Sequence, residues 1–223
     1  MAVPERTRAP REEEECGETG NPRPRPIHPK RIHIVGGPGS GKTRLSLEVS
    51  ALTGAPVFHL DEVARVGGGV GPLRDVDERT RMVRSVVAMD RWITEGVHLG
   101  WTEELLETAD VIVWLDFLTW PSATRRVAGR FAAGAIREMR RRPIKERFTR
   151  FGDYGRQLRA LAAAIRESHH YYEDVASPEV TAEHAKQLAE SRAHTRLLLE
   201  RHGDRLAHCR TAEDVARFLD TLA

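Results

Sequence analysis

Residues 36–43 read Gly-Gly-Pro-Gly-Ser-Gly-Lys-Thr, a complete phosphate-binding loop of the form G-x-x-x-x-G-K-[ST]. The glycines permit a tight turn that aims backbone N–H groups at phosphates. The lysine brings a positive charge to the β- and γ-phosphates, and the threonine hydroxyl can bind Mg²⁺. A short β-branched run at 31–35 precedes the loop and a helical pattern follows it. This context predicts that the chain binds ATP or GTP. The predicted nucleotide-binding residues are Gly36, Gly37, Pro38, Gly39, Ser40, Gly41, Lys42 and Thr43.

Four further apolar runs follow along the chain, and we interpret each as a strand of a mainly parallel sheet. They span 56–60, 92–94, 111–115 and 205–209. The 111–115 run is continuously apolar, as expected for a strand covered on both faces. Helical patterns at 43–53, about 77–90, 102–108 and 121–133, and a capped terminal helix from Thr211, separate or follow the strands. The predicted fold class is therefore α/β, with helices on both faces of the sheet.

Two segments stand apart from this alternation. Residues 1–29 contain a run of four glutamates and six of the twelve prolines but few apolar side chains, which predicts a disordered tail before a domain at 30–223. Between the last two strands, apolar positions at helical spacing predict a helical hairpin at about 153–202, broken at Ser177-Pro178. We expect this hairpin to pack against the sheet or over its ligand-bearing edge.

Bulk composition excludes several classes of protein. Two cysteines make neither a disulfide framework nor a metal cluster, and no window approaches the ~18 apolar residues of a membrane span. The N-terminus lacks an apolar signal core, so we expect a cytoplasmic protein. A formal net charge of +2 does not by itself indicate a nucleic-acid partner.

Three acidic residues follow predicted strands, where ligands of a parallel sheet collect. Asp116 follows the fourth strand, and we predict that it holds Mg²⁺ together with Thr43; a helix cap is the alternative. Asp61 follows the second strand and is predicted to orient a substrate hydroxyl or accept its proton. Glu95 follows the third and either contacts the ligand or makes a structural hydrogen bond. Phe117 stands where many hydrolytic P-loop ATPases carry a water-activating glutamate, which favours transfer to a substrate.

Residues 125–150 contain ten Lys or Arg residues against two acids. A mobile segment that closes arginines over the transferring phosphate would supply charge and exclude water, and we predict Arg126 and Arg130 in this role. A solvated basic face and a nucleic-acid backbone patch are the alternatives.

A second cluster of polar side chains follows at His169-His170-Tyr171-Tyr172. These residues occupy consecutive helical positions that point in different directions, so we interpret them as structural or surface residues. No metal site besides that for Mg²⁺ is predicted.

The segments 31–43, 59–61, 90–96 and 109–116, in this order, resemble the adenylate kinase-related P-loop proteins known as DNA topology modulation proteins. The resemblance implies a nucleoside/nucleotide kinase fold, with a five-stranded parallel sheet in the order 2-3-1-4-5 and an arginine-bearing lid, at about 125–150, after the fourth strand. It implies that Lys42 and Thr43 contact the phosphates and Mg²⁺, that Asp61 faces the acceptor, and that lid arginines lie near Arg126 and Arg130. Arg210, directly after the last predicted strand, joins the predicted nucleotide-binding set.

One departure concerns the acceptor. Adenylate kinases bind their monophosphate through a Gly-Phe/Tyr-Pro-Arg segment, where this chain reads Glu95-Gly96-Val97-His98. The sequence therefore predicts an ATP-dependent kinase, with ATP and Mg²⁺, for a small-molecule acceptor that it does not identify. The alternative is a nucleotide-dependent regulatory or DNA-associated P-loop protein, and a hydrolytic ATPase ranks third. Nucleic acid is not the expected partner but stays open, as do the choice between ATP and GTP and the oligomeric state.

Overall fold

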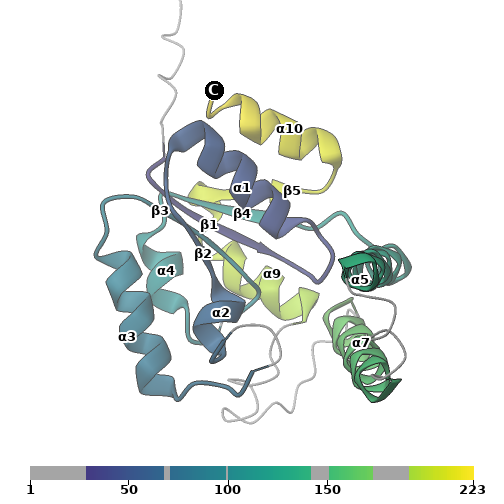
Figure 1. The fold of residues 1–223 in the computed structure, drawn as a ribbon. Helices are drawn as coiled ribbons and strands as arrows, with labels where there is room; N and C mark the ends of the chain where they lie inside the picture. Colours follow the sequence, from purple (N-terminus) through teal and green to yellow (C-terminus); the bar gives the residue numbers. More distant parts are fainter. Residues whose placement is uncertain (1–28, 68–70, 99, 142–150, 173–190) are drawn as a thin grey trace, which may run out of the picture.

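A single five-stranded parallel sheet organises the protein (Figure 1). The computed structural model describes residues 29–67, 71–98, 100–141, 151–172 and 191–223. The strand order is β2-β3-β1-β4-β5, which confirms the predicted topology. The strands are β1 (Arg31–Gly36), β2 (Val57–His59), β3 (Trp92–Glu95), β4 (Val111–Leu115) and β5 (Leu206–Cys209). The predicted tail at 1–29 falls, apart from its last residue, outside the described residues.

The helices follow the predicted alternation. They are α1 (Lys42–Thr53), α2 (Leu60–Ala64), α3 (Val76–Val87), α4 (Glu103–Thr108), α5 (Trp120–Arg141), α7 (Phe151–Tyr172), α9 (Arg192–Glu200) and α10 (Ala212–Asp220), with a 3₁₀ turn at Gly203–Arg205. The predicted cap of the last helix is a capping box between Thr211 and Asp214. The second strand is shorter than predicted because α2 begins at Leu60, so Asp61 lies in the first turn of this helix. No helix in the described ranges is long and apolar enough to cross a membrane.

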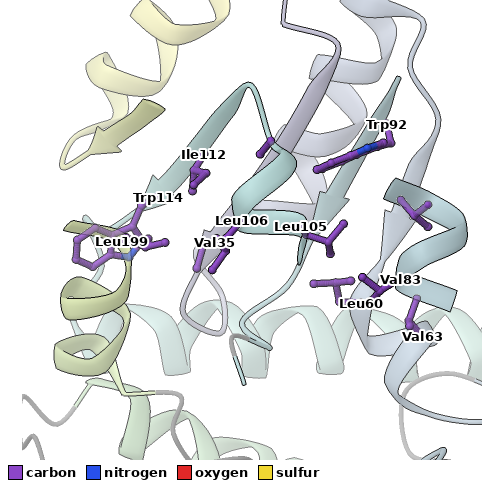
Figure 2. Packing of buried hydrophobic residues seen from close by; sticks show 12 residues of the cluster. Val35, Leu60, Val63, Val83, Trp92, Leu105, Leu106, Ile112, Trp114 and Leu199 are labelled. Atoms are coloured by element: carbon purple, nitrogen blue, oxygen red, sulfur yellow. The ribbon is translucent and has the colours of Figure 1, made fainter. Parts of the chain in front are cut away.

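Each face of the sheet has its own apolar core. On one face, residues of α2, α3, α4 and α9 pack against Trp92 and Trp114, which are 0% and 1% exposed (Figure 2). On the other, Leu45 and Val49 of α1 and Phe218 of α10 pack against β1, β3 and β4. Burial on both faces explains the continuously apolar strands and fixes the carboxyl ends of β1, β3 and β4 beside one another.

The helices between β4 and β5 lie at two separate positions in the fold. Helices α5 and α7 pack against each other and lie side by side next to the loop between β1 and α1 (Figure 1). Helix α9 packs on the sheet instead, where Leu199 is fully buried in the first core. The described part of the predicted hairpin thus contributes α7 to the loop and α9 to the sheet. Its break at Ser177-Pro178, and the part of the basic stretch at 142–150, lie outside the described residues.

His33 makes the stability of this fold depend on pH. Its imidazole lies in β1 at 0% exposure, with Nδ1 2.8 Å from the Thr94 hydroxyl, and burial lowers its pKa to about 3. Between pH 6.5 and 3 the unfolded chain therefore takes up a proton that the folded protein does not. We expect the free energy of unfolding to fall, from this residue, by up to about 1.4 kcal/mol for each pH unit below about 6.

The test compares urea unfolding at pH 7.0, 5.5 and 4.5 for the unchanged protein and for His33→Gln, which keeps a polar side chain but does not titrate. The variant should show the smaller loss of stability on acidification. An equal loss in both proteins would show that the buried imidazole does not govern this pH range.

Candidate functional site

The phosphate-binding loop joins β1 to α1 as the sequence predicts. Gly39 and Gly41 have φ values of 76° and 100°, a backbone conformation that favours glycine. The Lys42 ammonium donates to the carbonyl oxygens of Gly36 and Gly37, at 2.6 and 3.2 Å. The lysine therefore lies over its own loop, and the N-terminus of the 12-residue helix α1 points at the same place. A helix N-terminus, with the N–H groups of its first turn, and a lysine together form an anion-binding arrangement.

Neighbouring elements press closely on the loop. A Cβ atom added at Gly36 would lie 2.8 Å from the Leu115 carbonyl oxygen, and one at Gly39 would lie 3.0 Å from the Ala123 carbonyl oxygen. One at Gly37 would lie 2.7 Å from the Tyr172 hydroxyl oxygen. Strand β4 and helices α5 and α7 therefore all lie against the loop, and a side chain at Gly36 would require the backbone of β4 to shift.

The two tyrosines at the end of α7 contact the phosphate-binding loop, a structural role that agrees with the sequence interpretation, although the sequence did not place them beside the loop. Tyr172 donates its hydroxyl to the Pro38 carbonyl oxygen at 2.9 Å, and Tyr171, 3% exposed, accepts from the Trp114 indole at 3.4 Å. Burial raises the pKa of Tyr171 to about 12 and raises that of Tyr172, so both hydroxyls stay protonated at neutral pH. Tyr171 and Tyr172 are consecutive in α7 and so point in different directions. Both nevertheless lie against the phosphate-binding loop, at Gly37 and Pro38.

The Thr43 hydroxyl, predicted as a Mg²⁺ ligand, donates to Oε1 of Glu95 at 3.0 Å. The same carboxylate oxygen lies 2.8 Å from Nδ1 of His59, and Glu95 is only 7% exposed. Strand β3 thus brings a buried carboxylate to the first turn of α1, and β2 supplies the histidine that orients it. Glu95 thus makes the structural hydrogen bonds of the second alternative, with Thr43 and His59, while its contact with a ligand stays a prediction.

Asp61 lies at the carboxyl end of β2 on the same side of the loop. Its Oδ1 is 2.8 Å from Nε2 of His98, and 76% of the Asp61 side chain is exposed. The hydrogen bond from His98 holds the pKa of this carboxyl below its usual range, and the positive charges of Lys42 and Arg65 act in the same direction. Asp61 is therefore an ionised, exposed carboxylate in the electrostatic field of the loop lysine.

Asp116 occupies the other side of the loop, after β4. Its Oδ1 accepts from Nε of Arg192 at 2.5 Å, and its Oδ2 lies 2.9 Å from Nε2 of His208. Arg210 extends this network, because its Nε donates to Nδ1 of His208 at 3.3 Å. The hydrogen bonds thus pair Thr43 with Glu95 and Asp116 with Arg192 and His208. The predicted Mg²⁺ role of Asp116 stays a prediction.

A pocket of about 370 Å³ opens beside this network. It lies at the carboxyl ends of β4 and β5, and α9 contributes two of its arginines. The lining residues are Asp116, Phe117, Leu118, Thr119, Arg192, Arg196, His208 and Arg210. Arg210, predicted to bind nucleotide, therefore lines this pocket. With three arginines and one aspartate in its wall, the pocket favours an anionic or hydrogen-bond-accepting ligand.

The predicted lid arginines lie on α5. The guanidinium of Arg126 stands 6.0 Å from the centre of the Phe117 ring, and both Arg126 and Arg130 are exposed. Ala123 of the same helix contacts Gly39, so Arg126 is three residues from the loop contact. The structure thus brings Arg126 to the pocket wall. Arg130 lies one turn further along α5. Among the described residues, no cluster of three or more His, Cys, Asp or Glu side chains could hold a metal.

Comparisons with known proteins identify similar folds but no family. No protein-family model and no curated protein matches this chain. A shikimate kinase from Acinetobacter baumannii, in complex with shikimate, is 18% identical over 79% of this chain and 94% of that protein, with a TM-score of 0.37. A gluconokinase from Sinorhizobium meliloti 1021 is 14% identical over 79% and 98% of the two chains, also with a TM-score of 0.37. Such low scores support no assignment of activity, and the resemblance to topology modulation proteins stays a prediction.

Proposed function

We propose that this protein is an ATP-dependent kinase that transfers the γ-phosphate to a hydroxyl group of a small-molecule acceptor. The observation that carries the proposal is the loop geometry, in which Lys42 lies over the Gly36 and Gly37 carbonyls and Thr43 contacts a buried carboxylate of β3. Phosphoryl transfer needs positioning and charge stabilisation more than covalent chemistry, and these groups supply both.

The donor set fits Mg²⁺, which prefers oxygen ligands and takes only one or two from the protein when a nucleotide supplies the rest. Thr43 and Glu95 offer a hydroxyl and a carboxylate oxygen that lie 3.0 Å apart. Asp116 is the second candidate for the carboxylate, as the sequence predicts. When held by Thr43 and one of these carboxylates, Mg²⁺ would supply positive charge that neutralises the negative charge developing during transfer.

The remaining steps belong to the chain's own side chains. Lys42 would turn from the loop carbonyls to the β- and γ-phosphates, and the loop amides would hold the same oxygens. The acceptor oxygen forms a bond to the γ-phosphorus while the bond from this phosphorus to the bridging oxygen breaks, and ADP leaves with the electron pair. The acceptor proton passes to Asp61. Arg126 and Arg130 would approach the transferring group from α5.

The two sides of the loop suggest how the substrates lie. Glu95 and Asp61 are at the ends of β3 and β2, so the γ-phosphate and the acceptor would lie on that side. The nucleoside would then extend toward the β4–β5 side, into the pocket that Arg210 and Phe117 line. Arginine guanidinium groups stack well on planar rings, so this wall suits a nucleotide base.

The first experiment incubates the protein with Mg²⁺-ATP or Mg²⁺-GTP and measures diphosphate release, alone and with a panel of acceptors. The panel holds nucleosides, nucleoside monophosphates, sugars and hydroxy acids, with shikimate and D-gluconate among the last. Samples with EDTA or without protein serve as blanks. Acceptor-stimulated ADP release with a phosphorylated product is the expected result. Slow turnover that no acceptor changes would overturn the kinase proposal.

In that event the regulatory or DNA-associated reading becomes the better one. The specific feature behind it is the row of exposed arginines on α5, at Arg125, Arg126, Arg130, Arg137 and Arg140. It requires duplex DNA binding that weakens steeply with salt, because each neutralised phosphate releases counterions. A kinase for small molecules requires no such affinity at physiological salt.

A further inference from the structure

The hydrogen bond between Asp61 and His98 leaves Asp61 suited to act as a general base. One carboxylate oxygen, Oδ1, is held by Nε2 of His98 at 2.8 Å. Within the described part of the chain, the other oxygen, Oδ2, has no protein donor, and the side chain is 76% exposed. The carboxylate is therefore fixed at one oxygen and open at the other, toward solvent and the phosphate-binding loop.

His98 is itself held firmly by its own loop. Its carbonyl oxygen accepts the Thr102 hydroxyl, and Thr102 is fully buried at the start of α4. Its ring lies 5.4 Å from the Trp101 ring, and the guanidinium of Arg79, from α3, stands 5.3 Å from the centre of that indole. The imidazole is 21% exposed. Contacts with Thr102 and with Trp101, whose ring is covered by Arg79 of α3, therefore hold His98 independently of Asp61.

Asp61 has fewer constraints. It lies in a five-residue helix, and the chain beyond it runs into the Gly-rich segment at 67–71. An exposed aspartate on such a short element samples several rotamers unless a partner selects one. The hydrogen bond from the fixed His98 imidazole selects one rotamer of Asp61. Carboxylate–histidine pairs orient ligands in the same way in other sites.

We propose that His98 is a positioning residue that holds Asp61 in the orientation needed to receive the acceptor hydroxyl. This inference rests on the proposed kinase function. In the transfer step, the acceptor O–H donates to Asp61 Oδ2, the acceptor oxygen bonds to the γ-phosphorus, and the proton ends on Asp61. His98 keeps its hydrogen bond to Oδ1 throughout and exchanges no proton with the substrate. A misplacement of about 1 Å at such a base can cost up to about 100-fold in rate.

The charges around the pair favour a hydroxyl over a phosphate at this position. Asp61 is ionised, and its second oxygen, Oδ2, faces solvent. An acceptor phosphate placed directly at Oδ2 would be repelled by this carboxylate. A neutral hydroxyl meets an acceptor oxygen, so the pair selects an alcohol.

The test compares His98→Ala with His98→Gln, whose side-chain amide can still donate to Asp61. With the panel acceptor that the unchanged protein phosphorylates, His98→Ala should lower kcat about tenfold, while the Kd for Mg²⁺-ATP stays unchanged. His98→Gln should recover most of the loss. The matched control is Glu62→Gln, an exposed acid one residue beyond Asp61, which should leave kcat unchanged. Thermal melting establishes that each variant is folded.

A second readout needs no acceptor. In ¹³C-labelled protein, the Asp61 carboxyl should titrate below its usual pKa, and His98→Ala should raise that pKa while His98→Gln keeps it low. The other charged groups near the pair, Lys42, Arg65 and Arg79, are the same in all three proteins. An unchanged kcat in His98→Ala would overturn the positioning role of His98, and so would an Asp61 pKa that is the same in all three proteins. Either result would leave the kinase proposal intact. Failure of the unchanged protein to phosphorylate any panel acceptor would overturn the kinase proposal and this inference with it.

Discussion

Replacement of Lys42 by alanine is expected to lower the rate of phosphoryl transfer by about 100- to 1,000-fold. The ammonium is the one side-chain charge that the loop itself carries, and it lies within 3.2 Å of two loop carbonyls at the point where phosphates would bind. Removal of a single preorganised group that stabilises transition-state charge typically costs this much in kcat. The measurement is acceptor-dependent ADP release at saturating Mg²⁺-ATP.

A matched control exists on the same helix. Arg44 is two residues beyond Lys42, but its guanidinium turns away to Glu48, at 2.7 Å, and its side chain is 85% exposed. Arg44→Ala therefore removes a cation from the first turn of α1 without touching the loop, and should keep transfer within about twofold. Lys42→Ala should also stay folded, since the two carbonyls that it leaves can bond water. Equal activity in Lys42→Ala and the unchanged protein would remove the loop from the reaction.

The fold was predictable because its determinants are local in the sequence. Buried parallel strands are short and continuously apolar, and the loop at 36–43 fixes which strand is the first of the set. The run Val111–Leu115 matches β4 at both ends. The other strands differ from their predicted bounds by one residue at an end, and α5 runs on to Arg141. At the end of β2 the difference arises because α2 starts directly at Leu60, which the sequence pattern predicts as strand.

The sequence could predict only those residues of the site that come directly after a strand or at its end. Asp61, Glu95 and Asp116 could all be placed at the carboxyl edge of the sheet, but their partners come from loops and distant helices. The bond from His98 depends on how the loop before α4 is held, and no periodic pattern encodes it. Tyr171 and Tyr172 reach the loop from α7, 134 residues away from Pro38 in the case of Tyr172. Contacts of this kind require the tertiary structure.

The sequence predicts Asp116 as the metal carboxylate, but the strand order makes Glu95 a second candidate. In the order β2-β3-β1-β4-β5, both β3 and β4 are neighbours of β1, so Glu95 and Asp116 follow strands that flank the loop on opposite sides. An acid after either strand has the same sequence signature. The Thr43 hydroxyl donates to Glu95, and for this reason we propose Glu95 beside Asp116 as a metal carboxylate.

Glu95→Gln is therefore expected to lower Mg²⁺-dependent transfer by about 100-fold and to raise the Mg²⁺ concentration required for half-maximal rate. Glutamine keeps the shape and can still bond Thr43, but it removes the charge that attracts a divalent cation. Asp116→Asn should leave the Mg²⁺ requirement unchanged, because both oxygens of Asp116 already serve Arg192 and His208. It should instead lower the free energy of unfolding, by about 1–3 kcal/mol, as a 6%-exposed carboxylate loses its charge beside Arg192.

Two measurements separate the residues: the rate as a function of Mg²⁺ concentration, and urea unfolding at pH 7. The expected pattern is a shifted Mg²⁺ curve with little change in stability for Glu95→Gln, and the reverse for Asp116→Asn. The exposed Glu62→Gln should shift neither. A raised Mg²⁺ requirement in Asp116→Asn alone would identify Asp116, after β4, as the metal carboxylate. It would also mean that Arg192 and His208 release the carboxylate when nucleotide binds, since the same oxygens cannot serve both partners and the ion.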